Sequence, residues 1–94
     1  MNDNDSLIME QKKKILLKAI GEVVFENRST LNKGINKFSF EYDIGNGLLS
    51  RLEHGTTDTK ITTLWKLANA FEIKFSDFSK LNEKKLPSDF NFYE

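Results

Sequence analysis

The longest amphipathic pattern in the chain runs from residue 7 to residue 27. Its apolar positions are spaced by threes and fours, as on one face of a helix: Ile15, Leu16, Ala19, Ile20, Val23 and Val24. Asp5 or Ser6 is expected to cap the first turn, because a short oxygen-bearing side chain accepts a hydrogen bond from a free backbone N–H group. The pattern therefore predicts one long helix, followed by a turn over residues 29–34.

A second, much shorter amphipathic segment covers residues 35–42. It turns Phe38 toward the interior, with help from Ile35 and Tyr42. Asp43 follows at a point where the chain has to turn sharply, and Asp tolerates left-handed backbone better than most residues do. The pattern predicts a short helix that ends in a tight turn.

The segment 46–54 is expected to form a third helix with a polar start. Leu49 and Leu52 are three residues apart and share one face, while Gly55 supplies a glycine stop. Leu48 is expected at the edge of the core, with contact to a thymine methyl group as the alternative. A helix with small and polar side chains near its N-terminus is of the kind that enters a DNA major groove.

Two more helices are expected after a polar loop over residues 56–60. One covers residues 61–71, and its inward positions are Ile61, Leu64, Leu67, Ala68 and Phe71. The other begins at Ser76, which is expected to act as its cap. Asp77 lies near the positive end of that helix, and Phe78 and Leu81 point inward.

No strand pattern and no repeat interrupts these helices, so the sequence predicts an all-α fold, a single compact domain of five helices. Its 94 residues suffice for one domain and not for two. Residues 1–10 are expected to be a flexible or helical extension and residues 11–82 the folded domain. Residues 83–94 would form a tail that packs back on the domain or joins a dimer interface.

Charge and composition narrow the possible functions. The chain has 14 basic and 14 acidic residues, yet the segment from Arg28 to Lys66 carries six Lys or Arg against four acids and is weakly basic. The absence of cysteine excludes disulfides and thiolate chemistry, and no apolar run approaches the length of a membrane span. These features, with a polar and acidic N-terminus unlike a signal peptide, predict a cytoplasmic protein that is not bound to a membrane.

The sequence gives no support for an enzyme. His54 is the only histidine, and no carboxylate pair at ligand spacing accompanies it. We therefore expect no metal site, no cofactor, no catalytic residue and no small-molecule ligand. The run Lys12-Lys13-Lys14 is expected to be a solvated helix face, with contact to DNA or to an anionic partner as the alternative.

Three segments, taken in order, resemble the phage-repressor and Cro-like helix-turn-helix family, often called XRE. They are residues 20–28 ending in Arg28, residues 44–55 with Ser-Arg-Leu-Glu-His-Gly at the end, and residues 64–71 with Leu-Trp-Lys-Leu-Ala. The resemblance covers about residues 15–81 and implies a lambda-repressor-like fold. It further implies that Arg28 pairs with Glu53, since a planar guanidinium suits bidentate binding of a carboxylate.

The resemblance also implies a sequence-specific transcriptional regulator that places its third helix in the major groove of double-stranded DNA. By position, the side chains or backbone that read base edges are Asn46, Gly47, Ser50 and Arg51. Those that contact phosphates are Asn36, Lys37, His54, Thr56, Thr57 and Lys60. The phage, restriction–modification and antitoxin contexts remain equally open.

A homodimer is expected, because one recognition helix covers only a few base pairs. The candidate contacts lie on the last helix, the aromatic tail and one tryptophan: Trp65, Phe78, Leu81, Phe90, Phe92 and Tyr93.

Several positions depart from the family pattern. Gly34 and Ile35 open the second helix in place of a hydroxyl residue and Gln, Gly45 and Gly47 flank the start of the third, and Glu72 replaces the usual glycine after the fourth. These departures, with the zero net charge, favour an alternative: a protein-interaction module or antitoxin-like partner that keeps the fold and reads DNA weakly.

Overall fold

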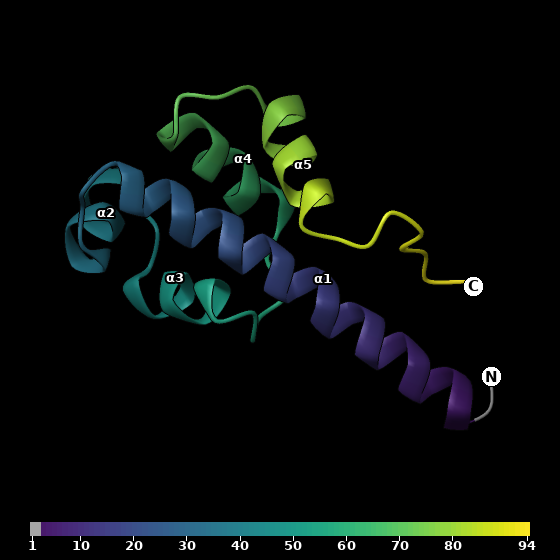
Figure 1. Cartoon of the computed structure of the whole chain (residues 1–94). Coiled ribbons are helices and arrows are strands. Elements are labelled where there is room, and N and C mark those ends of the chain that lie inside the picture. Colours follow the sequence, from purple (N-terminus) through teal and green to yellow (C-terminus); the bar gives the residue numbers. More distant parts are fainter. Residues whose placement is uncertain (1–2) are drawn as a thin grey trace.

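The computed structural model describes residues 3–94, which fold into five helices (Figure 1). The elements are α1 (Asp3–Thr30), α2 (Ile35–Tyr42), α3 (Asn46–Glu53), α4 (Ile61–Ala70) and α5 (Phe75–Lys84). No strand occurs within residues 3–94, so the predicted all-α class is confirmed. α1 passes through the middle of the molecule, with α3 on one side and α4 and α5 on the other (Figure 1).

The bounds of α2 agree with the prediction, whereas α1 is longer than expected at both ends. Because α1 begins at Asp3, Asp5 and Ser6 lie inside the helix and the predicted caps are wrong. Residues 1 and 2, the start of the expected extension, lie outside the described residues. At the other end α1 continues to Thr30, and Asn32 stops it in the left-handed conformation at φ 56°.

The start of α5 also differs from the prediction. The helix begins at Phe75 after Lys74, whose backbone is extended, so Ser76 is inside the first turn and does not cap it. Phe75 packs against the core, which places the start of the helix one residue earlier than the polar pattern indicates. Asp77 does lie in the first turn, where a negative charge is favourable.

The core joins all five helices. Its largest fully buried side chains are Phe38, Phe78, Leu49, Leu67, Val23 and Val24. The ring of Phe71 bridges two helices, with its centroid 5.6 Å from that of Phe38 and 6.4 Å from that of Phe78. The burial of Phe78 makes its predicted dimer role wrong. Ile61 is 58% exposed, contrary to prediction, because the first residue of α4 lies beyond the edge of the core.

Each of the four turns between the helices contains a residue with left-handed backbone, Asn32 being the one between α1 and α2. Asp43, at φ 54°, takes this conformation as predicted, and Gly55, at φ 71°, follows the end of α3. Glu72, at φ 57°, does so after α4 in the position where the resembled family has glycine. A residue with a Cβ loses roughly 1–2 kcal/mol in this conformation, so the turn at Glu72 is strained.

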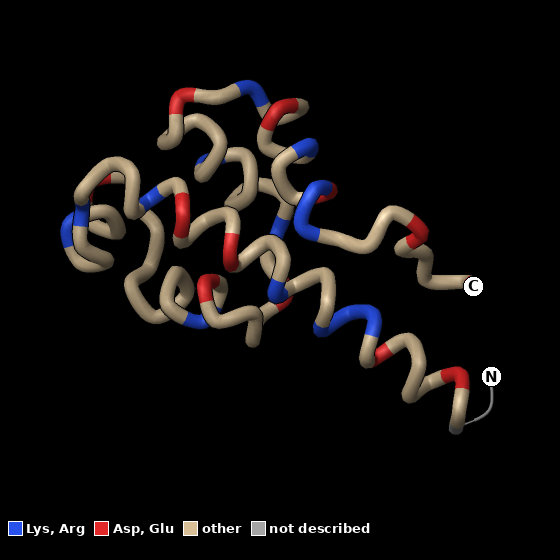
Figure 2. The backbone as a smooth tube through the Cα atoms, in the orientation of Figure 1, with Lys and Arg blue, Asp and Glu red and all other residues tan. Residues whose placement is uncertain are grey.

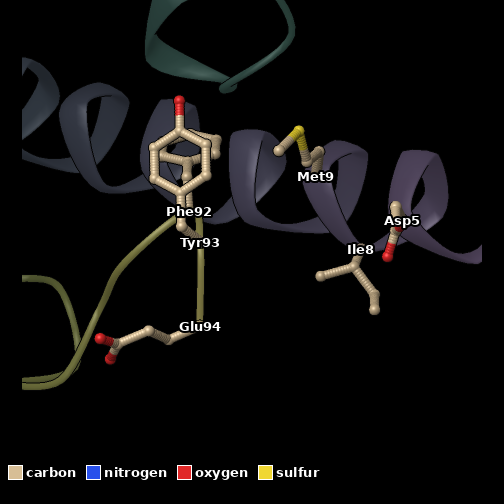
Figure 3. Close-up of a pocket in the computed structure, with 6 residues that line it drawn as sticks. All are labelled: Asp5, Ile8, Met9, Phe92, Tyr93 and Glu94. Carbon is tan, nitrogen blue, oxygen red and sulfur yellow. The ribbon is translucent and has the colours of Figure 1, made fainter. Parts of the chain in front are cut away.

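The tail after α5 folds back along the N-terminal half of α1 and not over the core. The Lys12 ammonium donates hydrogen bonds to the backbone carbonyls of Asn91 and Glu94. The rings of Phe90 and Phe92 meet edge to face at 5.5 Å. The tail and α1 enclose a shallow pocket of about 410 Å³, with Phe92 and Tyr93 beside the helix (Figure 3). The tail therefore packs beside the first half of α1, and its expected part in a dimer interface stays a prediction.

None of the helices within residues 3–94 combines the length and the apolarity that crossing a membrane requires.

Candidate nucleic-acid interface

α3 is a two-faced helix held close to α2 by the turn at residues 43–45. Its inner face buries Leu49 and Leu52, and Leu48 packs at the core edge, as predicted. The four predicted base-reading positions share the opposite side of α3: Asn46, Gly47 and Arg51 are exposed, and Ser50 is partly exposed. The structure thus brings these four positions onto one outward surface.

A partly buried ion pair fixes the C-terminal end of α3. Arg28 Nε lies 2.7 Å from one carboxylate oxygen of Glu53 and Arg28 Nη2 lies 2.9 Å from the other, a parallel bidentate arrangement. The side chains are only 12% and 7% exposed. The hydrogen bond with Glu53 raises the pKa of Arg28 above its ordinary value, against the opposing effect of burial.

The same guanidinium also reaches the segment that leads into α2. Its Nη1 donates a 2.8 Å hydrogen bond to the backbone carbonyl of Lys33. One side chain therefore ties together the end of α1, the start of α2 and the end of α3. The pair expected from the resemblance is present, and its geometry makes it the brace that orients α3.

Gly21 is a positioning residue that reasoning from the sequence missed. A Cβ at this position would lie 2.5 Å from the backbone oxygen of Leu52 and 2.7 Å from that of Glu53. Only a glycine allows α1 and α3 to approach so closely, since the atoms it would meet are backbone and cannot move aside. The one signal in the sequence was a glycine inside an otherwise regular helical pattern.

The outward surface of α3 carries two internal contacts. Asn46 Nδ2 donates a hydrogen bond to Asn36 Oδ1, which joins the starts of α2 and α3. A Cβ on Gly47 would lie 3.2 Å from Arg51 Nη1, so the guanidinium of Arg51 rests over the glycine. Gly47 therefore makes room for Arg51, a role that the sequence alone did not indicate.

The predicted phosphate contacts differ in how free their polar groups are. Asn36 and Lys37 are exposed on α2, and Lys60 is exposed at the start of α4. Thr56 Oγ1 donates a 3.1 Å hydrogen bond to the carbonyl of Arg51. His54 Nδ1 lies 2.7 Å from the carbonyl oxygen of Ser50. Thr57 is partly buried and lines a small pocket beside α1.

Ion pairs neutralise part of the charge around α2 and α3. Lys33 donates a hydrogen bond to Glu41, which raises the pKa of Lys33 and lowers the pKa of Glu41 from their ordinary values. Lys66 lies 3.9 Å from the Asp43 carboxylate. Lys37, Arg51 and Lys60 have no ion-pair partner among residues 3–94. Basic and acidic positions are otherwise interspersed over this part of the molecule (Figure 2).

The described part of the chain contains no group of three or more His, Cys, Asp or Glu side chains that could hold a metal ion. Among the dimer candidates, Trp65 is 51% exposed and stacks on Phe75 with ring centroids 4.3 Å apart. Leu81 is partly buried against the core. Phe92 and Tyr93 line the pocket beside α1, and Phe90 packs against Phe92. Comparisons with protein-family models, curated proteins and solved structures found no match for the chain.

Proposed function

We propose that the protein is a DNA-binding transcriptional regulator of the helix-turn-helix type that inserts α3 into the major groove. The observation that carries the proposal is the Arg28–Glu53 pair, which braces a helix whose opposite side is polar and open. A recognition helix needs this combination, because base contacts demand a fixed orientation and free side chains. The likeness to XRE proteins and a cytoplasmic location belong to the same proposal.

Each outward side chain of α3 has a defined role in this proposal. Arg51 donates to the N7 and O6 atoms of guanine, and Asn46, oriented by Asn36, contacts adenine. Ser50 makes a weaker contact between them. Lys37 and Lys60, which have no ion-pair partner among the described residues, contact phosphates on either side. The protein acts without a cofactor and without catalysis, as a homodimer on an inverted repeat.

The salt dependence of DNA association tests this function. The logarithm of the association constant is expected to fall linearly with the logarithm of salt concentration, with a slope that reflects several phosphate contacts.

Arg51→Ala is expected to weaken the free energy of DNA binding by about 1–3 kcal/mol and to relax the preference for one base pair. Lys80→Ala, on the exposed surface of α5, is the matched control and should leave that preference unchanged. An Arg51→Ala variant with unaltered site preference would contradict the base-reading role.

One observation favours a protein-interaction module as the second candidate. Phe40 is 92% exposed and lies on the same outer side of α2 as Asn36 and Lys37. A phenyl ring offers neither a positive charge nor a hydrogen-bond donor to a phosphate, whereas aromatic side chains are enriched at protein interfaces. Loss of partner binding in Phe40→Ala, with no DNA association in the parent chain, would favour this candidate.

A further inference from the structure

The N-terminal half of α1 carries apolar side chains that the fold leaves uncovered. We define residues 3–18 as the arm, since the first buried residue of α1 in the described part of the chain is Ala19. The N-terminal part of the arm extends away from the helices of the body and has the tail beside it (Figure 1). The C-terminal part of the arm, residues 12–18, also lies against the loop that follows α3. Within the arm Leu7 is 62% exposed, Ile8 47% and Ile15 46%. These three side chains are separate from the Arg28–Glu53 ion pair and from the outward surface of α3.

Two of these side chains lie on one line along the helix. Ile8 and Ile15 are seven residues apart, which places them on the same face two turns from each other. Gln11 lies between them on nearly the same line and is exposed. Ile8 and Tyr93, whose ring is exposed, line the same pocket between the arm and the tail (Figure 3). The arm therefore presents a short apolar seam of the kind that packs against another helix.

The charge along the arm indicates which helix that is. Residues 3–11 contain Asp3, Asp5 and Glu10 and no basic residue, whereas residues 12–18 contain four lysines and no acid. The two blocks follow each other along the arm (Figure 2). A second copy in antiparallel orientation would set its basic block beside the acidic block, and the opposed helix dipoles would also be favourable.

We propose that the arm pairs with the arm of a second copy in antiparallel orientation, with Ile8 of each copy against Ile15 of the other. This inference supplies the dimer surface for the proposed function and rests on that function only for its consequence on DNA. The two-fold axis would pass between residues 11 and 12. This axis would run perpendicular to the plane that contains the two paired helices. Rotation about it leaves each side of that plane where it is, so the same surface of both copies faces the same side of the dimer.

This symmetry sets the spacing of the two α3 helices. Gly21, where α3 meets α1, lies about a third of a turn around the helix from the seam, so both copies of α3 lie on one side of the dimer. Along α1, Gly21 is about ten residues or ~14 Å from the two-fold axis. The two copies are then ~28 Å apart along the helices, and on the order of 30–35 Å apart once the lateral separation is included. Half-sites one DNA turn apart require ~34–36 Å.

Analytical ultracentrifugation of the full chain over a range of micromolar concentrations tests the seam. The parent chain is expected to show a reversible monomer–dimer equilibrium, and Ile8→Asp/Ile15→Asp is expected to be monomeric throughout. Phe40→Asp is the matched control, since it places the same charge on an exposed apolar residue far from the arm, and it should dimerise like the parent. A parent chain that stays monomeric, or a dimer unaffected by the double substitution, overturns the proposal.

Single cysteines test the orientation, because the chain has none of its own. Gln11→Cys lies next to the two-fold axis and is expected to form a disulfide-linked dimer on mild oxidation. Glu22→Cys is on the same side of α1 but remote from the axis, so it should dimerise like the parent chain without forming a disulfide between the two copies. Cross-linking of both variants would mean parallel arms and would overturn the proposal.

The failure of this inference and that of the proposed function remain distinguishable. Dimerisation through the arm without DNA association would refute the function and leave the dimer. The opposite result combines DNA association and an Arg51-dependent site preference with a dimer that Ile8→Asp/Ile15→Asp does not weaken. That result would refute the arm pairing and leave the function. Circular dichroism of each variant excludes loss of helix as the cause.

Discussion

The two halves of α1 belong to one continuous helix but have opposite relations to the rest of the protein. Residues 19–30 bury Ala19, Val23 and Val24 and hold α3 through Gly21 and Arg28. Residues 3–18 contain no buried side chain among those described and expose three large apolar ones. The comparison shows that helix formation and helix packing are separate properties, since the same element serves as scaffold at one end and as free surface at the other.

What differs between the halves is long-range contact and not local helix preference. The scaffold half has a glycine at the crossing with α3 and an arginine that reaches across 25 positions in sequence to Glu53. The arm has neither: Lys12 donates hydrogen bonds to the tail, and Lys13 lies 3.9 Å from Asp58 in the loop after α3. Gly21 and Arg28 join the scaffold half to α3, beside the apolar side chains that this half buries, and substitutions can test each of the two residues.

The largest expected effect follows from breaking the ion pair in the scaffold half. Arg28→Met leaves the carboxylate of Glu53 buried without its partner, which is expected to lower the free energy of unfolding by about 3–5 kcal/mol. Urea denaturation followed by circular dichroism measures the change. Lys85→Met, which removes the exposed pair with Glu26, is the control and should lower the free energy of unfolding far less, because water and salt screen an exposed ion pair. Equal losses in the two variants would mean that Arg28 does not brace α3.

A smaller loss is expected from Gly21→Ala. The added methyl group would overlap backbone oxygens of α3, and overpacking of this kind costs about 1–3 kcal/mol, even though alanine favours helix. Gly34→Ala is the matched control, because a Cβ there meets nothing within 4 Å. Thermal denaturation of both variants measures the difference. A Gly21→Ala variant as stable as the Gly34→Ala variant would refute the close approach of α1 and α3.

The smallest effect on stability is expected in the arm. Ile15→Gln removes an exposed apolar side chain that makes no contribution to the core, so the free energy of unfolding of the monomer should change by less than about 0.5 kcal/mol. Urea denaturation at high dilution, where the monomer predominates, measures it. A loss comparable to that of Gly21→Ala would mean that the arm is part of the folded body, and the contrast between the two halves would disappear.

The sequence contained more information about the faces of the helices than about their ends. Periodicity located all five elements and the inward side of α2 and α3, because burial repeats with the turn of the helix. The predicted caps failed at Ser6 and Ser76 because α1 starts three residues before Ser6 and α5 starts one residue before Ser76. The N-caps of α2 to α5 make no side-chain hydrogen bond, so these starts are set by backbone conformation and packing.

The sequence predicted a contact between side chains of different helices only where the family resemblance implied it. The Arg28–Glu53 pair was predicted in this way, and its geometry is present in the structure. The tight crossing at Gly21, the stacking of Arg51 over Gly47 and the link from Asn46 to Asn36 depend on distances between helices, which no spacing along the chain encodes. The burial of Phe78 was likewise hidden, because an inward residue and an interface residue share the same pattern.

Selection of bound fragments from a random DNA pool, with the purified full chain at near-physiological salt, tests whether α3 reads DNA. We expect enrichment of one inverted repeat whose half-site centres lie about one helical turn apart. Circular dichroism on the same preparation verifies that the protein is folded. Recovery of no enriched sequence by folded protein would contradict the claim that α3 reads DNA.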